Sequence, residues 1–275
     1  MKILDGAIGT ELISRGVARE TEPFGASAIV DSPGALEALH GDYARAGATV
    51  HTANTFRTQA HRIGDRWRAS LRAAVEIARQ AVPAEHVLLG SLAPIEDCYR
   101  PDLSPGRQSF DAHREMSTAL VDEGCDVVLC ETFADEAEAL TAVEASLRAG
   151  ATVWLSLTAG PEGDLLSPKA FRRIGRRAID LGAKRLLANC IGAPRIAPYV
   201  SALVETGAPV GVYANAGPVG KGIGWDDATD EGVARYVALA AGWADLGASL
   251  IGGCCGTGPR HIAALADYFD QTAFG

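Results

Sequence analysis

The sequence has 275 residues, of which 48% are hydrophobic and 21% charged, with a formal net charge of −9 and a pI near 5.2. This length suits one large α/β domain or two small ones, and the negative charge argues against binding to nucleic acid, which requires a basic surface. No apolar run is long enough to cross a bilayer, and the N-terminus lacks the apolar segment of a signal peptide. We therefore expect a cytoplasmic protein without a membrane partner.

One sequence unit recurs along the chain: a helical segment, a glycine that is usually followed by alanine, and a short apolar run. The predicted strands, in chain order, are residues 3–4, 49–51, 87–89, 126–129, 153–155, 186–188, 210–213 and 250–251. Six of these eight runs follow a glycine, namely Gly47, Gly124, Gly150, Gly182, Gly207 and Gly247. We expect each glycine to end a helix in the left-handed conformation, and each apolar run has the length of a buried parallel strand.

Eight strands that alternate with helices predict an α/β fold, a single-domain (β/α)₈ TIM barrel over residues 1–275. The main alternative is a doubly wound open sheet, in which a glycine-rich phosphate loop follows the first strand. Residues 5–10 read Asp-Gly-Ala-Ile-Gly-Thr, which does not match the pattern G-x-G-x-x-G. This mismatch favours the barrel.

Residues with reactive or polar side chains recur at one distance from these glycines. Seven or eight residues after a glycine, where the strands should end, stand Glu131, Asn189, Cys190, Asn215, Cys254 and Cys255. In a TIM barrel the carboxyl ends of all strands share one rim, and active sites are built there. The spacing therefore predicts a functional site that combines these residues.

Three cysteines at this rim, Cys190, Cys254 and Cys255, form a candidate metal site. Glycines flank the Cys-Cys pair on both sides, which leaves the backbone free to turn both sulfurs towards one point. Three thiolates suit Zn²⁺, and three protein ligands leave a fourth position open for a substrate. Because the thiolates offset the charge of the ion, such a site favours lowering the pKa of a substrate thiol over activating water. Three unrelated buried cysteines are the alternative that the residues leave open.

Other reactive side chains are expected to have structural roles. Cys98, Cys125 and Cys130 have no partners at ligand spacing, and Cys125 and Cys130 are expected to pack as small core residues. His51, at the end of the second predicted strand, is expected to be hydrogen-bonded rather than to bind the metal. The segment 93–107, rich in proline and glycine, is a candidate for covering the mouth of the barrel.

Short motifs are distributed along the whole chain. They are Asp-Gly-Ala-Ile-Gly-Thr-Glu-Leu at 5–12, Thr-Ala-Asn-Thr-Phe at 52–56, Cys-Glu-Thr at 130–132, Asn-Cys at 189–190, Tyr-Ala-Asn-Ala-Gly at 213–217, and Gly-Gly-Cys-Cys-Gly-Thr at 252–257, followed by Pro259, His261 and Ile262. Together they resemble the homocysteine S-methyltransferase family over nearly the whole chain, and the two cysteine segments are the most specific.

The resemblance implies that the three cysteines bind Zn²⁺ and that the homocysteine sulfur becomes the fourth ligand. It implies that Glu131 pairs with the ammonium group of homocysteine, that the Asp5–Gly6 loop helps to hold the amino-acid end, and that Asn215 lies close to the metal. Thr55 of the Thr-Phe motif is expected to contact the substrate, and Asp5 and Glu131 are the candidate catalytic residues. A rim carboxylate needs a cationic partner or solvent. The alternatives are that Glu131 anchors a loop and that Asp5 only caps a turn.

The expected reaction, a step of methionine biosynthesis, transfers a methyl group from a cationic donor to the thiol of homocysteine. S-methylmethionine is the favoured donor and S-adenosylmethionine the second. Two departures from the family argue against betaine: Phe24 stands where several branches have tryptophan, and Thr132 stands where the betaine branch has an aromatic residue. The alternatives are a homocysteine-activating subunit of a corrinoid-dependent enzyme, a methyltransferase for another thiol or selenol, and a non-catalytic zinc-binding barrel. The sequence does not indicate the oligomeric state.

Overall fold

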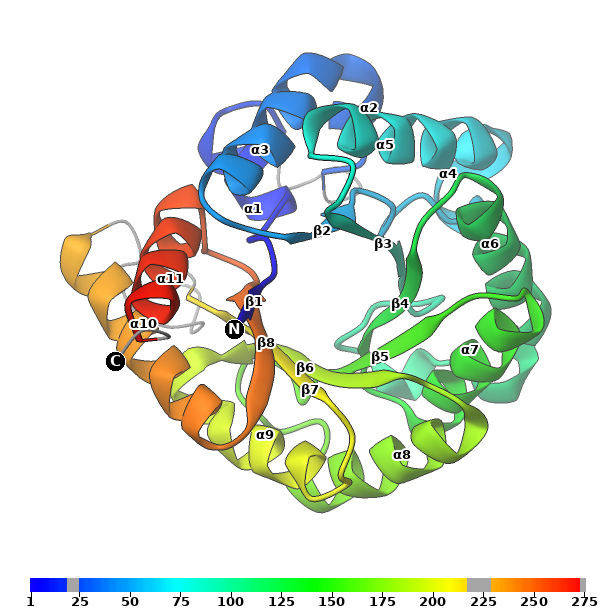
Figure 1. Cartoon of the computed structure of the whole chain (residues 1–275). Coiled ribbons are helices and arrows are strands. Elements are labelled where there is room, and N and C mark those ends of the chain that lie inside the picture. The colour runs from blue at the N-terminus through cyan, green and yellow to red at the C-terminus, as the bar shows by residue number, and fades with distance from the viewer. Residues whose placement is uncertain (19–24, 217–228, 273–275) are drawn as a thin grey trace.

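Eight parallel strands curl into a barrel, and helices surround it on the outside (Figure 1). The structure is a computed structural model that describes residues 1–18, 25–216 and 229–272. The strands are β1 (Lys2–Ile3), β2 (Val50–Ala53), β3 (Val87–Leu92), β4 (Val127–Phe133), β5 (Val153–Leu157), β6 (Arg185–Gly192), β7 (Val210–Asn215) and β8 (Ala248–Gly253). Each of the eight predicted strands falls on one of them, so the predicted positions are confirmed.

The helices and short 3₁₀ turns connect successive strands. The helices are α1 (Gly9–Ser14), α2 (Ala28–Asp31), α3 (Pro33–Arg45), α4 (Ala60–Ile63), α5 (Trp67–Ala81), α6 (Phe110–Asp122), α7 (Glu136–Arg148), α8 (Pro168–Leu181), α9 (Ala197–Val204), α10 (Asp230–Asp245) and α11 (Pro259–Thr272). The 3₁₀ turns are η1 (Gly64–Arg66), η2 (Pro101–Leu103), η3 (Gly106–Ser109) and η4 (Ala193–Arg195). The six glycines that precede strands have φ between 80° and 125°, which confirms the left-handed helix ends. No helix within the described residues is long and apolar enough to cross a membrane.

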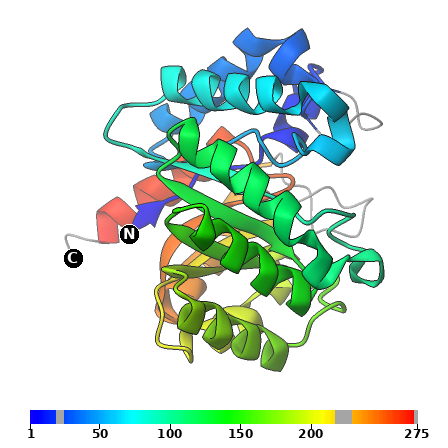
Figure 2. The same ribbon diagram turned by 90° about the vertical axis from the view of Figure 1, so that its right-hand side faces the viewer.

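The ends of the sheet meet, which distinguishes the barrel from an open sheet. The strand order is β1-β8-β7-β6-β5-β4-β3-β2, and a parallel bridge between Leu4 and Val50 joins β1 to β2. The backbone N–H of Asp5 also donates to the Val50 carbonyl at 3.0 Å. Viewed from the side, β1 starts at one end of the barrel and α11 runs back towards the same end (Figure 2). The predicted TIM barrel is confirmed, and the doubly wound alternative is wrong.

The inside of the barrel has an apolar layer and a polar layer. The apolar cluster consists of Leu4, Val50, Leu89, Val127, Leu129, Leu187, Tyr213 and Leu250, with Trp154 packed against it. Because side chains alternate between the two faces of a strand, the inward series continues two residues further on with polar side chains. These are Ser91, Glu131, Ser156, Asn189 and Asn215. The polar layer lies at the carboxyl ends of the strands and forms the floor of the candidate site.

Candidate metal and substrate site

The three cysteines predicted as metal ligands lie together at the carboxyl ends of β6 and β8. The Sγ atoms of Cys190, Cys254 and Cys255 all lie within 4.8 Å of one another, and no other such group of potential ligands exists in residues 1–18, 25–216 and 229–272. The Sγ atoms of Cys190 and Cys254 are 2.8 Å apart, well beyond the roughly 2.05 Å of a disulfide bond. The cysteines are therefore not separate core residues.

Cys190 reaches this position through a bulge rather than at a strand end. The glycine spacing predicts that the strand ends at Cys190, but β6 continues to Gly192. The register between β6 and β7 shifts between Asn189 and Gly192, and Cys190 has a φ of 53°. A bulge of this kind re-aims a side chain without ending the strand.

The Cys254–Cys255 turn is held by backbone contacts. The N–H of Cys254 donates to the Ala214 carbonyl at 2.9 Å, and the carbonyl of Cys255 accepts from the Ala216 N–H at 2.9 Å. A Cβ atom on Gly253 would lie 2.2 Å from the Thr257 Oγ1, so this position requires glycine. These contacts turn both sulfurs to one side, as the flanking glycines predicted.

Asn215 also contacts this turn. Its Oδ1 accepts a hydrogen bond from the Cys255 N–H at 3.1 Å. Its side chain is fully buried, and its Nδ2 has no hydrogen-bond partner among the described residues. Asn215 therefore lies beside the sulfur cluster and still has a donor to offer.

The three sulfurs shift one another's pKa values. Hydrogen bonds from Cys190 and Cys254 hold the pKa of Cys255 well below its usual range, while the same contacts and burial raise the pKa of Cys190. Two thiolates on a tetrahedral Zn²⁺, at about 2.3 Å each, lie about 3.8 Å apart. The separations within the cluster, from 2.8 Å to less than 4.8 Å, bracket that value, and the three soft donors suit this ion.

The carboxyl groups of Asp5, which is buried, and of Glu131, which is half-buried, face the same part of the rim. Asp5 is 2% exposed and accepts hydrogen bonds from the Thr52 N–H at 2.8 Å and from the Thr52 hydroxyl at 3.4 Å. Glu131 accepts a hydrogen bond from the Ser91 hydroxyl. Burial raises the pKa of both carboxyl groups, and the charge of Glu131 raises that of Asp5 further. Neither carboxyl group forms an ion pair within the described residues. A bound cation would therefore stabilise their ionised forms.

Gly6 and Thr55 both have structural contacts. A Cβ on Gly6 would lie 2.7 Å from the Tyr43 ring, and the Tyr43 hydroxyl donates to the Ala7 carbonyl at 2.6 Å. Thr55 donates its hydroxyl proton to the Ser91 carbonyl at 2.8 Å. Direct contact of Gly6 or Thr55 with a substrate stays a prediction.

His51 is not at the rim. It is the second residue of β2, and its Nε2 lies 3.0 Å from Nδ1 of His86, which precedes β3. The apolar pattern predicts that the strand ends at His51, but β2 continues to Ala53. It is hydrogen-bonded, as expected, and it belongs to the opposite end of the barrel from the cysteines.

Tyr99 is a site residue that the sequence reasoning missed. Burial raises its pKa, and so does the negative charge of the cysteines, with Cys190 and Cys255 contributing most. Its neighbour Cys98 is buried and also interacts with the charge of Cys255. The loop between β3 and α6 therefore does lie next to the sulfur cluster. The richness of segment 93–107 in proline and glycine was the only sequence signal for this loop, because no motif marks Tyr99.

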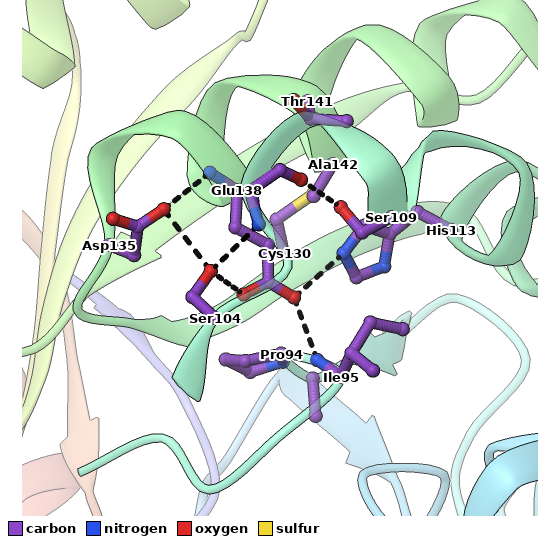
Figure 3. Close-up of polar contacts among 12 residues, drawn as sticks. Pro94, Ile95, Ser104, Ser109, His113, Cys130, Asp135, Glu138, Thr141 and Ala142 are labelled. Atoms are coloured by element: carbon purple, nitrogen blue, oxygen red, sulfur yellow. Dashed lines mark hydrogen bonds and ion pairs between the residues drawn. The ribbon is translucent and has the colours of Figure 1, made fainter. Parts of the chain in front are cut away.

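This loop is fixed by a buried network around Glu138 of α7 (Figure 3). The Glu138 carboxylate accepts hydrogen bonds from the Ile95 N–H at 2.8 Å, from His113 Nε2 at 3.2 Å and from the Ser104 hydroxyl at 2.5 Å. Asp135 caps the same helix by accepting from the Glu138 N–H at 2.8 Å. Although burial opposes its ionisation, these hydrogen bonds lower the pKa of Glu138. The buried charge thus holds both ends of the segment that carries Tyr99.

Comparisons with known proteins agree on one family. A family model described as homocysteine S-methyltransferase matches residues 2–269. The homocysteine S-methyltransferase of Escherichia coli K12 is 30% identical over 96% of this chain and 93% of its own length. The rat S-methylmethionine–homocysteine S-methyltransferase is 27% identical over 87% of this chain and 70% of its own length. The crystal structure of an Escherichia coli homocysteine methyltransferase in its metallated form matches with a TM-score of 0.80 and 27% identity, covering 98% of this chain and 96% of the other.

Proposed function

The chain belongs to the homocysteine S-methyltransferase family, and we propose that it transfers a methyl group from S-methylmethionine to the thiol of homocysteine on a zinc ion held by Cys190, Cys254 and Cys255. One observation carries the proposal: three sulfurs within 4.8 Å of one another share a rim with the unpaired carboxyl groups of Asp5 and Glu131. Homocysteine has a thiol at one end and an ammonium group at the other, so it complements both features.

Zinc fits the donor set. When bound, Zn²⁺ with three thiolate ligands supplies one open coordination position and lowers the pKa of a thiol that occupies it. Asn215 orients Cys255 through the 3.1 Å hydrogen bond to its backbone. Tyr99, on the loop that Glu138 fixes, is close enough to the cysteines for their charge to raise its pKa, so its ring is a candidate for limiting the access of water.

The carboxyl groups bind and orient the amino-acid end of homocysteine. An ammonium group between Asp5 and Glu131 favours their ionised forms and thereby reverses the effect of burial on their pKa values. The N–H of Gly6 has no hydrogen-bond partner among the described residues and is available to the substrate carboxylate. Held at this end, the substrate directs its sulfur towards the cysteines, which supplies the alignment that a displacement reaction requires.

The reaction forms a bond between the homocysteine sulfur and the methyl carbon and breaks the bond from that carbon to the donor sulfonium. The thiol proton passes to solvent, and the donor leaves as a neutral thioether. The name of the rat relative supports S-methylmethionine as the donor. Thr132 is 2% exposed and hydrogen-bonded, so the residue directly after Glu131 offers no aromatic ring to enclose betaine. Phe24, the other departure from the family, lies outside the described residues.

The test is to incubate the zinc-loaded protein with homocysteine and each donor in turn and to measure methionine. S-methylmethionine should give two molecules of methionine for each homocysteine consumed, since acceptor and donor both become methionine. S-adenosylmethionine should react more slowly, betaine should give no product, and a chelator should abolish turnover. Turnover that a chelator does not affect, in protein without zinc, would refute the metal-dependent reaction. Turnover only with a methylated corrinoid protein would exclude the proposed donor.

A further inference from the structure

Two residues at the rim have an unusual backbone conformation. Thr132 on β4 has a φ of 65° and Cys190 on β6 has a φ of 53°, and they are the only non-glycine residues with positive φ in the part of the chain that the structure describes. This conformation is unfavourable for a β-branched side chain such as threonine, and it persists only where the surroundings hold it. The two positions therefore need a specific interaction that maintains them.

Both residues lie in bulges of the sheet. Between Cys130 and Phe133, β4 has one residue more than the facing part of β5. Between Asn189 and Gly192, β6 has one residue more than the facing part of β7. The first bulge contains Glu131 next to Thr132, and the second contains Cys190, so each carries one group of the proposed site.

A buried hydrogen-bonded bridge joins the two bulges. Asn189 Nδ2 donates to Thr132 Oγ1 at 2.7 Å, and the Ser156 hydroxyl donates to Asn189 Oδ1 at 2.7 Å. Thr132 is 2% exposed, and Asn189 and Ser156 are fully buried. A buried amide with both of its ends satisfied is held in one orientation, because any rotation leaves a polar group unpaired.

We propose that the hydrogen bond between Asn189 and Thr132 is a positioning device that fixes the Cys190 sulfur relative to the Glu131 carboxylate. Thr132 directly follows Glu131, and Asn189 directly precedes Cys190, so the bridge sets the separation of the two groups through the backbone. The metal-binding part of this inference rests on the proposed zinc site of Cys190, Cys254 and Cys255, whose sulfurs lie within 4.8 Å of one another. The substrate-binding part rests on the proposed function, in which Glu131 holds the ammonium group and Cys190 the metal.

Thr132→Val is the sharpest perturbation, because valine keeps the branched shape and has a methyl group in place of the hydroxyl group. Asn189 then loses its acceptor, and both bulges are free to relax. Thr132→Ser is the matched control, since it keeps the hydroxyl group. We expect Thr132→Val to bind zinc about 10-fold more weakly in competition with a chromogenic chelator, the usual lower bound for losing a partner that orients a metal ligand. Thr132→Ser should stay within about threefold of the native affinity.

Ser156→Ala perturbs the other end of the bridge and leaves Thr132 intact. Zinc affinity should fall in the same direction by a smaller factor. For all variants we would also measure the Tm of the metal-free protein and the KM of homocysteine. The KM should rise more than kcat falls, because the bridge orients groups that bind the substrate. A merely structural role would lower the Tm and leave the zinc affinity unchanged.

Zinc affinity within about twofold of native in both Thr132→Val and Ser156→Ala would overturn the proposal. If Thr132→Val does not fold, Ser156→Ala decides by the same criterion. These outcomes are separate from the fate of the proposed function. A native protein that transfers no methyl group, but whose zinc affinity falls in the variants, would refute that function and support the bridge.

Discussion

Glu131→Gln removes the charge of a half-buried carboxylate and keeps a side chain of nearly the same shape. The Ser91 hydroxyl can still donate to the remaining side-chain oxygen, so the local hydrogen bond survives. Loss of one partner from a buried, hydrogen-bonded charge pair costs about 2–5 kcal/mol. At about 1.4 kcal/mol for each factor of ten, this is a loss of about 30-fold to about 4000-fold in homocysteine binding. Because Asp5 still offers a carboxyl group, we expect the lower end of this range.

The assay is the KM for two acceptors at saturating S-methylmethionine. 4-Mercaptobutyrate is homocysteine without its amino group, so it makes no contact that Glu131→Gln removes. The substitution should raise the KM of homocysteine at least about 30-fold and that of 4-mercaptobutyrate less than about threefold. Zinc content must be equal in both proteins. An equal loss with both acceptors would refute the reasoning, since Glu131 would then act on the metal or the fold rather than on the ammonium group.

Three further predictions follow from the structure. Cys190→Ser should lower the zinc content well below that of the native protein by metal analysis, whereas Cys125→Ser, the same change in a core cysteine away from the cluster, should not. Burial lowers the pKa of His40 from 6.5 to about 4, so the unfolded chain binds more protons than the folded one between these values. Stability should therefore fall as the pH drops from about 6.5 to about 4, by about 3 kcal/mol from this group in urea unfolding, and His40→Leu should flatten that dependence. Glu138→Gln removes one carboxylate acceptor from the buried hydrogen bonds to Ile95, Ser104 and His113 and should destabilise the fold by about 1–3 kcal/mol. Hydrogen exchange in residues 93–104 should then rise, and unchanged protection there would show that the loop does not depend on this carboxylate.

The fold was predictable because its signals are local. A buried parallel strand must be apolar on both faces, and a helix that stops just before it favours a glycine, so the sequence shows both features at six of the eight strands. The position of Cys254 and Cys255 followed from the same repeat. His51 was misplaced because its strand continues with Thr52 and Ala53, a weakly apolar pair that does not mark a strand.

The rest of the site depends on contacts between distant residues. An extra residue in β4 or β6 looks like a longer strand, so the bulges at Thr132 and Cys190 have no signature in the sequence. Glycine, the usual sign of positive φ, is absent at both positions. Tyr99 is on a loop whose Ile95 backbone is held by Glu138, a residue on a later helix. Such a placement appears only once the chain is folded.

The seam of the barrel joins the first residues of the chain to its last strand. Asp5 is held between the last strand and the second one, since its carbonyl accepts from the Gly253 N–H at 3.1 Å and its N–H donates to Val50 at 3.0 Å. A chain that lacks β8 therefore lacks both the Gly253 N–H that binds the Asp5 carbonyl and the two cysteines that follow β8. The backbone position of Asp5 therefore depends on β8, a strand about 250 residues later in the sequence, and a chain truncated before β8 should lose this contact together with Cys254 and Cys255.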